Sequence, residues 1–419
     1  MRILHTSDWH LGKTLEQINR IDEQREFIDC LCKKVEEEKV DLVLVAGDVY
    51  DTYNPSAAAE ELFYDAIERL NGKGKRAIVV IAGNHDNPER LCAASPLAYK
   101  NGIILLGYPG SDAGTHKIDG GNIKIIDSGI GWFELWISGC EHNAVILTLP
   151  YPSEARLEEI LSSEADEGKL QKAYSERIGN LLSKLSEKFR EDTVNLVVSH
   201  LFLKGGKESD SERTIQVGGA LTVDPAVLPP NAHFIALGHL HRPQMVKDAP
   251  CPAYYSGSPL AYSFSEAEYS KAIYIIDAEP GKESKVEPHY LNCGKPLRRW
   301  KAEEGIGQAM KWCEEGRDAN AWIDLEIHTD RVLTSEEQKK LRELNPGIIN
   351  IRPVIKLEAG EAVSYENRES KKIDDLFTEY YKFKTGTEVS EELMAVFLDV
   401  LNPKADEEKD ETATGGDAA

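Results

Sequence analysis

Five short motifs combine carboxylate, amide and imidazole side chains, and each motif follows a run of apolar residues. Their polar members are Asp8 and His10, Asp48, Asn84 with His85 and Asp86, His200, and His239 with His241. Oxygen and nitrogen ligands without a cysteine thiolate suit Mn²⁺, Fe²⁺ or Zn²⁺ better than Ca²⁺ or a closed structural zinc site. The residue types therefore predict a catalytic centre with divalent cations, and manganese is the first choice.

The spacing within the motifs supports two neighbouring cations. Asp8 and His10 are two residues apart, as are His239 and His241, so both members of a pair can point to one side at a strand end. Asp48 has two carboxylate oxygens and can bridge two cations. Two divalent cations lower the pKa of bound water and stabilise the attacking and leaving oxygens of an in-line displacement. The predicted reaction is hydrolysis of a phosphoester.

His85 has a different predicted role, because it follows the predicted ligand Asn84 but is not needed as a ligand itself. It can act as a general acid or stabilise charge in the transition state. Either Asp51 or Asp86 could orient it and favour its protonated form. We therefore predict His85, Asp51 and Asp86 as catalytic residues and the remaining motif residues as metal ligands.

Each of these residues also has an ordinary explanation when taken singly. A lone His or Asp after a strand is most often a cap or a hydrogen-bonded polar group. Five such clusters in order, all following strand-like runs, favour one shared site instead.

The apolar runs have the length of β-strands, and helical patterns separate the first three. The runs span residues 3–6, 41–46, 77–82, 195–199 and 233–237. Apolar residues recur at helical spacing from Phe27 to Val35 and from Leu62 to Leu70. Alternating strands and helices predict an α/β sheet, in which ligands collect at the carboxyl ends of the strands. Residues 103–149 contain further β runs with Gly-rich turns, which predicts a second sheet beside the first.

Smaller units are predicted in the rest of the chain. An apolar stripe from Leu170 to Phe189 indicates a helix, and residues 201–230 resemble a long polar loop. Strand and helix patterns alternate again between residues 296 and 355, as in a separate small α/β domain. The predicted boundaries are 1–280 for the domain with the motifs, 293–356 for the small domain, 357–370 for a linker, 371–402 for two short helices and 403–419 for a disordered acidic tail.

Each of the two predicted short helices has an apolar face that another surface must cover. Their stripes begin at Ile373 and Leu393 and have no obvious domain of their own to cover. An external helical partner is one interpretation, and docking back on the same chain is the other.

The composition bears on two questions, whether the chain could bind nucleic acid through a broad surface and where it is located. With 49 basic and 72 acidic residues the net charge is −23, which argues against a broad basic surface for nucleic acid. No run approaches the roughly 20 apolar residues of a membrane span, and no secretion signal precedes the first strand. Seven scattered cysteines without a CxxC pair predict reduced thiols. We expect a cytoplasmic protein without a membrane association.

The order of the motifs resembles that of the calcineurin-like metallophosphoesterases over about residues 1–280. The resemblance implies an α/β fold, a layered α/β/β/α sandwich, with His85 as the catalytic histidine. It assigns Asp8, His10, Asp48 and His241 to one cation, and Asp48, Asn84, His200 and His239 to the other. The spacing GD-x-x-D is similar to the phosphatase branch, in which the last Asp, here Asp51, supports the histidine.

Several longer stretches resemble the SbcD family of DNA nuclease subunits: MRILHTSDWHLGK, GDVYDTYNPS, AGNHDNPERL, GGKESDSER and ALGHLHRPQ. The resemblance implies ATP-dependent exonuclease action on double-stranded DNA ends and endonuclease action on single strands and hairpins, in DNA repair, replication and recombination. It also implies a complex of two copies with two copies of the ATPase SbcC. No GxxxxGK[ST] motif occurs, so ATP dependence would come from that partner.

The same resemblance gives roles to the C-terminal half. The small domain is similar to the family's capping domain, and residues 371–402 resemble the segment that grips the coiled-coil base of SbcC. A DNA groove formed together with SbcC and a second copy of the chain would explain why the chain itself is acidic. Arg298, Arg299 and Lys301 offer a local basic patch.

Two other functions fit part of the pattern. A stand-alone nucleotide phosphodiesterase or phosphatase would use the same cations, although the C-terminal helices argue against it. An inactive interaction scaffold on the same fold would not need a complete set of ligands, whereas this chain has every one.

Overall fold

The computed structural model describes residues 1–114, 121–157, 167–212 and 222–355, together with Phe377, Thr378, Tyr381, Val389, Leu393, Met394 and Phe397. The chain divides into two compact units, Met1–Ile355 and Lys356–Ala419. Among the described residues, no helix has the length and apolar character needed to cross a lipid bilayer.

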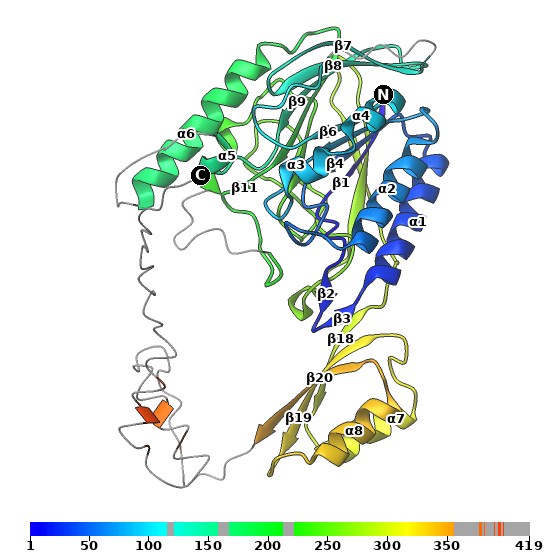
Figure 1. Ribbon diagram of the computed structural model, residues 1–419, viewed down its shortest axis with the longest axis vertical. Helices are drawn as coiled ribbons and strands as arrows, with labels where there is room; N and C mark the ends of the chain where they lie inside the picture. Colours follow the sequence, from blue (N-terminus) through cyan, green and yellow to red (C-terminus); the bar gives the residue numbers. More distant parts are fainter. Residues whose placement is uncertain are drawn as a thin grey trace, which may run out of the picture. The chain divides into compact units, whose positions relative to one another are not determined.

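The first sheet has six strands, and three of its parallel strands lead into the first three motifs (Figure 1). In order across the sheet the strands are β17 (Lys285–Tyr290), β16 (Ala272–Asp277), β1 (Arg2–Thr6), β4 (Leu42–Ala46), β5 (Ala77–Ile81) and β6 (Ile103–Leu106). Strands β1, β4, β5 and β6 pair in parallel, and β16 and β17 extend the sheet in antiparallel fashion. The motifs after β1, β4 and β5 therefore lie at one edge of the sheet.

The second sheet has seven strands, and two of them lead into the remaining motifs. In order the strands are β14 (Gln244–Met245), β15 (Ala253–Tyr255), β13 (Phe234–Gly238), β10 (Val194–His200), β9 (Ala144–Leu149), β8 (Trp132–Ile137) and β7 (Ile123–Gly129). Strands β9, β10, β13 and β15 are parallel. The five motif strands are thus divided between two sheets.

The predicted second sheet within residues 103–149 is correct for β7, β8 and β9 but wrong for Ile103–Leu106. That run forms β6 and pairs in parallel with β5 of the first sheet. Two short helices, α3 (Pro88–Cys92) and α4 (Ser95–Ala98), and the 3-10 turn η1 (Tyr99–Asn101) bring the chain back beside β5. A connection of this kind is the usual route between neighbouring parallel strands, and an apolar run alone does not reveal which sheet it joins.

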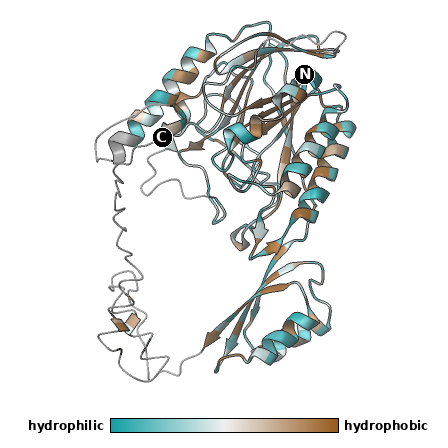
Figure 2. Cartoon of the chain, viewed as in Figure 1, coloured by the Kyte–Doolittle hydropathy of each residue, from teal (hydrophilic) through white to brown (hydrophobic). Residues whose placement is uncertain are grey.

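Helices cover the outer face of each sheet. Helices α1 (Ile21–Glu37) and α2 (Ala57–Asn71) pack on the first sheet, and α6 (Glu167–Ser186) packs on the second (Figure 1). In β4, Val43 and Val45 face the helices, while Leu42 and Leu44 lie in the core between the sheets. Burial on both faces explains the continuous apolar runs of these strands, seen as brown ribbons in Figure 2. The predicted α/β/β/α sandwich is confirmed.

Short elements line the edge where the motifs meet. Strands β2 (Thr14–Leu15) and β3 (Ile18–Asn19) form a hairpin between β1 and α1. The predicted loop 201–230 contains β11 (Phe202–Leu203), which pairs in parallel with β12 (Thr222–Val223), and the turn η2 (Pro225–Val227). Helix α5 (Glu154–Leu157) follows β9, and the turn η3 (Phe264–Glu266) precedes β16.

Residues 297–355 form a three-stranded parallel sheet with two helices. Its elements are β18 (Leu297–Ala302), α7 (Ile306–Glu314), β19 (Trp322–Thr329), α8 (Ser335–Leu344) and β20 (Ile348–Ile355). It has its own apolar core, in which Trp300 packs with Ile323 and Leu341. Trp322 Nε1 donates a hydrogen bond to Glu23 Oε1 of α1 at 2.9 Å, so this sheet also contacts the larger domain.

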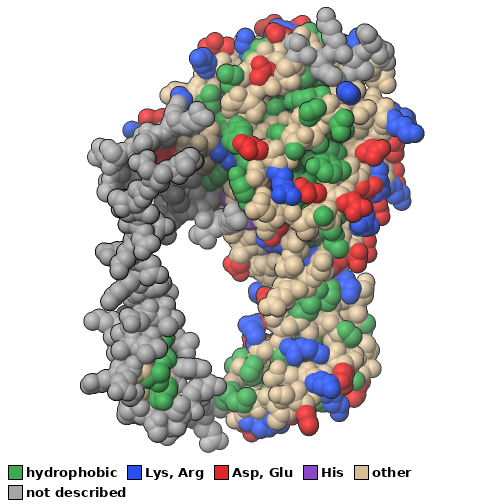
Figure 3. Space-filling model, viewed as in Figure 1, with side chains coloured by type: hydrophobic (Ala, Val, Ile, Leu, Met, Phe, Trp, Pro, Cys, Tyr) green, Lys and Arg blue, Asp and Glu red, His purple; other side chains and the backbone are tan. Residues whose placement is uncertain are grey.

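Acidic side chains lie beside the predicted basic patch. Each of its side chains lies within 4.0 Å of a carboxylate: Arg298 of Asp318, Arg299 of Asp324, and Lys301 of Glu303. On the face drawn in Figure 3, acidic and basic side chains are likewise interspersed. Two of these carboxylates are shared, since Asp318 also pairs with Arg317 and Asp324 with Arg352, so the acids offset only part of the positive charge of the patch.

Most of the second unit lies outside the described residues. This applies to the predicted linker 357–370, the acidic tail 403–419 and the greater part of the predicted helices 371–402. The rings of Phe377 and Phe397 stack with their centroids 3.7 Å apart. The two predicted helical segments therefore contact each other through aromatic side chains.

Candidate metal centre

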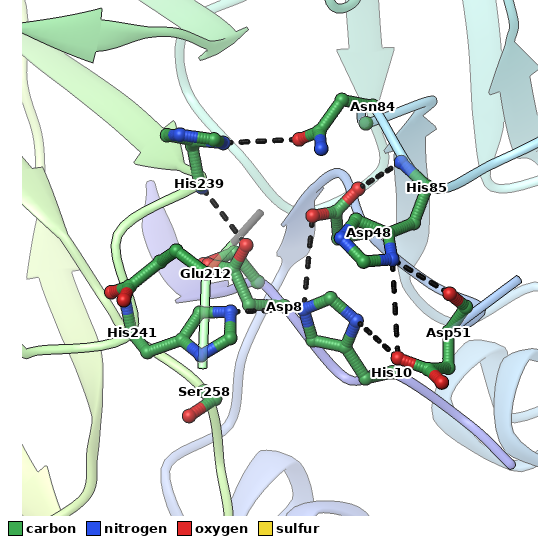
Figure 4. Close-up of polar contacts among 12 residues, drawn as sticks. Asp8, His10, Asp48, Asp51, Asn84, His85, Glu212, His239, His241 and Ser258 are labelled. Atoms are coloured by element: carbon green, nitrogen blue, oxygen red, sulfur yellow. Dashed lines mark hydrogen bonds and ion pairs between the residues drawn. The ribbon is translucent and has the colours of Figure 1, made fainter. Parts of the chain in front are cut away.

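The loops after the five motif strands meet at one place. Asp8 N donates to the carbonyl of Gly47 at 2.9 Å, and His10 N donates to that of Asp48 at 3.0 Å, so the first two motif loops run side by side. In the second sheet, the register of β10 and β13 sets His200 opposite Gly238, next to His239. Figure 4 shows most of the predicted ligands pointing into this common space.

The histidine and carboxylate side chains form three groups, each with candidate ligand atoms within 4.8 Å of one another. Two of them are Asp8, His10 and His241, and Asp48, His200 and His239; the third, His10, Asp51 and His85, shares His10 with the first. The family resemblance assigns the side chains of each of the first two groups to one cation.

Asn84 lies beside the group of Asp48, His200 and His239, and Asp48 also lies near His10 of the other group. Asn84 Oδ1 lies 2.9 Å from His200 Nε2 and 3.0 Å from His239 Nδ1. Asp48 Oδ2 lies 3.4 Å from His200 Nε2 and 3.7 Å from His10 Nε2, between the two groups. The carboxylate of Asp48 therefore has the position expected of a bridging ligand.

One hydrogen bond joins the two sheets at the centre. His200, at the end of β10, donates from Nδ1 to the carbonyl of Ala46, the last residue of β4, at 2.9 Å. This contact fixes the ring and leaves Nε2 directed toward Asn84 and Asp48. His5 makes a second contact between the sheets, from Nε2 to the carbonyl of Leu237 at 3.1 Å.

The backbone of the centre is strained at several ligand positions. Asp8, His10, Asp48 and His239 all have positive φ angles, of 53°, 46°, 51° and 105°. Residues other than glycine rarely adopt such angles, and they cluster where function requires them. The surrounding pairing of strands and loops must supply the free energy that holds them.

Close approach of the loops explains two glycines of the motifs. A Cβ atom on Gly83 would lie 2.1 Å from Asp48 Oδ1, and one on Gly238 would lie 1.9 Å from the carbonyl oxygen of Ala46. Both distances are far inside van der Waals contact, so a larger residue would push a ligand loop away from the centre.

Burial determines the charge state of the ligands. It lowers the pKa of His239 to about 3, that of His10 to about 4, and that of His241 well below the usual value, which leaves their lone pairs free. Burial also raises the pKa of Asp8 to about 8, although the nearby His200 opposes this shift. Burial disfavours the charged form of His200 too, but the attraction and hydrogen bond to Asp48, the attraction to Asp8 and the hydrogen bond to Ala46 together raise that pKa to about 9.

These buried groups fit divalent cations well. The Nε2 atoms of His10 and His241 face each other at 2.9 Å, an arrangement in which both lone pairs can point at one cation. The Nδ1 of His10 faces the Asp51 carboxylate at 3.5 Å, on the side of the ring away from this contact. Positive charge would offset the cost of burying Asp8 beside Asp48. The mixed nitrogen and oxygen donors suit Mn²⁺, Fe²⁺ or Zn²⁺.

His85 lies beside the first group, with its ring centroid 4.6 Å from that of His10. Its Nδ1 donates a hydrogen bond to the main-chain carbonyl of Asp51 at 2.6 Å, whereas the Asp51 carboxylate lies 3.9 Å away. That carboxylate instead accepts a hydrogen bond from Lys13 Nζ at 2.8 Å. The structure thus brings Asp51 to His85, but chiefly through its backbone.

Asp86 has a different environment from the one the sequence suggested. Its carboxylate accepts hydrogen bonds from the backbone N–H groups of Gly83 at 2.8 Å, Tyr50 at 2.9 Å and Val49 at 3.1 Å. Both oxygens are committed to these donors. The contacts favour a role in joining two motif loops over the predicted orientation of the His85 ring.

Several residues near the centre were not predicted from the sequence. Arg156 of α5 donates to the carbonyls of Gly83 and Asp86, both at 2.7 Å, on either side of Asn84 and His85. Lys13 belongs to the stretch DWHLGK, and its position close to the predicted ligands Asp8 and His10 in the sequence could have indicated that its side chain lies near the centre.

Ser211 and Glu212 also reach the centre, where both contact His241. They lie in the stretch GGKESDSER, which carried part of the family resemblance without any assigned role.

We predict that Mn²⁺ raises the melting temperature of the metal-free protein by several degrees, because a ligand that binds only the folded state stabilises it by about 2.7 kcal/mol per site at 100 times its Kd. Asp48→Asn should remove most of this rise, since Asp48 lies between both ligand groups. Differential scanning calorimetry with and without Mn²⁺ measures the shift.

The exposed Asp112 provides a matched control, and Asp112→Asn should respond to Mn²⁺ like the unaltered chain. An equal rise in Asp48→Asn would contradict the bridging position of Asp48.

Comparison with known proteins places this geometry in a family. A family model described as calcineurin-like phosphoesterase matches residues 1–243. A second, described as type 5 capsule protein repressor C-terminal domain, matches residues 293–385. Among solved structures, a dimetal phosphatase from Danio rerio is 13% identical with a TM-score of 0.35, over 68% of this chain and 98% of that one. A protein of Thermus thermophilus is 11% identical with a TM-score of 0.34, over 69% and 98%.

Two curated relatives match along nearly the whole chain, and both are the SbcD subunit of the nuclease SbcCD. The relative from Bacillus subtilis strain 168 is 46% identical over 409 residues, which cover 97% of this chain and 100% of that protein. The relative from Staphylococcus epidermidis is 28% identical over 398 residues, 93% of this chain and 95% of that protein. The chain therefore belongs to the calcineurin-like phosphoesterase family and, within it, to the family of SbcD subunits of the nuclease SbcCD.

Proposed function

We propose that this chain is the nuclease subunit of an SbcCD-type complex and hydrolyses DNA phosphodiesters at a centre of two divalent cations, with Mn²⁺ as the preferred ion. The observation that carries the proposal is the convergence of two ligand groups on Asp48, in a chain whose full-length relatives are named as nucleases. Asp8, His10, Asp48 and His241 would hold one cation, and Asp48, Asn84, His200 and His239 the other.

The residues of this chain would hold the cations, donate the proton that hydrolysis needs, and keep the donor in place. Two bound cations would activate the attacking water and stabilise charge on the phosphate. His85 is held by its Nδ1–H···O=C bond to Asp51, which leaves Nε2 free of that contact. Only the doubly protonated ring carries a hydrogen on Nε2 as well, and in that form it would donate this proton to the departing oxygen and be left as the neutral Nδ1–H ring. Arg156 holds the carbonyls of Gly83 and Asp86 and so keeps the His85 loop in place.

Asp51 and Asp86 support this chemistry in different ways. We assign the orientation of His85 to the backbone carbonyl of Asp51. The carboxylate of Asp51 lies 3.5 Å from His10 Nδ1 and 2.8 Å from Lys13 Nζ, so it supports a ligand rather than the proton donor. Asp86 fixes the distance between the second and third motif loops through its three backbone contacts.

Binding of DNA must overcome a net charge of −23. Phosphate neutralisation needs Lys and Arg, and acids offset part of the charge of the local basic patch. This charge supports a DNA groove completed by SbcC and by a second copy of this chain, in a complex of two copies of each. Double-stranded ends and hairpins are the proposed substrates, with ATP bound and hydrolysed by the partner.

The cysteine side chains support a proposal that the protein is located in the cytoplasm. All seven cysteines lie in the described part of the chain, and all are free. Free thiols at this number are usual in a reducing compartment, which supports the cytoplasm.

The direct test compares the unaltered chain with His85→Ala on two substrates in Mn²⁺: a labelled DNA hairpin and a small aryl phosphodiester. We expect the unaltered chain to cleave the hairpin, and His85→Ala to bind Mn²⁺ and DNA but cleave on the order of 10²- to 10⁴-fold more slowly, as for loss of a general acid. His289→Ala is the matched control, because that ring lies on β17, 3.8 Å from Glu38.

Normal cleavage by His85→Ala would refute the role of His85. Turnover of the aryl ester without any cleavage of DNA by the unaltered chain would instead identify a nucleotide phosphodiesterase.

The C-terminal segment has a separate prediction. All motif residues lie in Met1–Ile355, so removal of residues 371–419 should leave Mn²⁺-dependent cleavage of single-stranded DNA intact and abolish capture by immobilised SbcC. Removal of residues 403–419 alone keeps both apolar stripes and should preserve capture. Full capture by the longer truncation would refute the assignment of residues 371–402 to the partner.

A further inference from the structure

Two residues of the loop after β11 contact the predicted ligand His241. Ser211 Oγ is hydrogen-bonded to Nδ1 of the His241 ring. The neighbouring residue, Glu212, accepts a hydrogen bond from the backbone N–H of His241 at 2.8 Å through Oε1 (Figure 4). Two consecutive loop residues therefore contact the ring and the backbone of one ligand.

A buried ion pair lies on the far side of Ser211. Ser211 Oγ donates a hydrogen bond to Glu266 Oε1 at 2.5 Å. The other oxygen of Glu266 forms an ion pair with Lys271, and both side chains are buried. Lys271 Nζ also donates to the carbonyl of His241 at 3.0 Å and to Ser258 Oγ at 2.8 Å. The pair thus holds His241 from its backbone as well as through Ser211.

The number of protons in this chain of contacts selects one tautomer of His241. A serine hydroxyl has a single hydrogen, and the carboxylate of Glu266, paired with Lys271, can only accept. Ser209 Oγ lies farther from Ser211 Oγ, at 3.1 Å, and donates its own hydrogen to Glu212 at 2.7 Å. Ser211 therefore gives its hydrogen to Glu266 and must accept from His241, which places the ring proton on Nδ1. The lone pair is then on Nε2, the atom that faces His10 Nε2 at 2.9 Å.

We propose that Ser211 is a positioning residue that holds His241 as the Nδ1–H tautomer and thereby completes one of the two cation sites. The inference rests on the proposed two-cation centre. The ion pair of Glu266 and Lys271 fixes the direction in which the Ser211 hydroxyl donates its hydrogen bond. The described part of this loop, residues 204–212, is in this way joined to the cation site of Asp8, His10 and His241.

The energetics support a dedicated role for the network. Burying an ion pair is costly unless the geometry is good and the remaining donors and acceptors are satisfied. Here the three contacts of Lys271 Nζ, to Glu266, Ser258 and the carbonyl of His241, account for its three hydrogens. A partner that orients a metal-bound imidazole through its second nitrogen typically affects metal affinity 10- to 100-fold.

The test measures Mn²⁺ binding to the full chain by titration calorimetry and counts bound ions by electron paramagnetic resonance. The variants are Ser211→Ala, Ser211→Thr and Ser265→Ala. The last is a matched control, because Ser265 Oγ accepts from Asp210 N of the same loop at 3.1 Å without contacting His241.

We expect two sites in the unaltered chain, and in Ser211→Ala one of the two weakened by about 10- to 100-fold while the other is unchanged. Ser211→Thr keeps the hydroxyl and should retain both sites, as should Ser265→Ala. The melting temperature of the metal-free Ser211→Ala chain should stay close to that of the unaltered chain.

Three results would contradict the inference in different ways. Two unchanged sites in Ser211→Ala would show that the hydroxyl does not position His241. Equal weakening of both sites, with a lower metal-free melting temperature, would show that Ser211 stabilises the fold in general and does not position His241. No Mn²⁺ binding by the unaltered chain would refute the proposed two-cation centre itself, and with it this inference.

Discussion

Burial of two carboxylates and five imidazoles at one point is the constraint on which the rest of the structure depends. Asp8, Asp48, His10, His85, His200, His239 and His241 are all at most 4% exposed. In the absence of positive charge, burial keeps three of the imidazoles neutral and opposes ionisation of Asp8. Such a cluster is costly to assemble unless cations compensate it, so the fold must bring strong, rigid elements to this place.

The rigid elements are strands from two sheets, whose loops meet at the centre. His200 crosses from β10 to the last carbonyl of β4, and His5 crosses from β1 to Leu237 of β13. Glycines at Gly83 and Gly238 allow the loops to approach, and Asp86 ties two of them together. The strained φ angles of four predicted ligands show that this packing, and not local preference, sets their positions.

Much of this arrangement could be predicted from the sequence, because the ligands directly follow strands and strand ends are easily recognised. The sandwich required a family resemblance, since an apolar run does not show which sheet it joins, as Ile103–Leu106 illustrates. The contacts of Asp51 and Asp86 could not be predicted, because one uses a backbone carbonyl and the other backbone N–H groups. Ser211, Glu266 and Lys271 meet only through tertiary folding, and spacing along the chain gives no sign of their network.

The most direct test of the central claim is to locate Mn²⁺ by anomalous diffraction from crystals grown with the ion. We expect two peaks on either side of Asp48, one among Asp8, His10 and His241 and the other among Asn84, His200 and His239. A single peak, or two peaks that do not share Asp48, would contradict the two-cation centre.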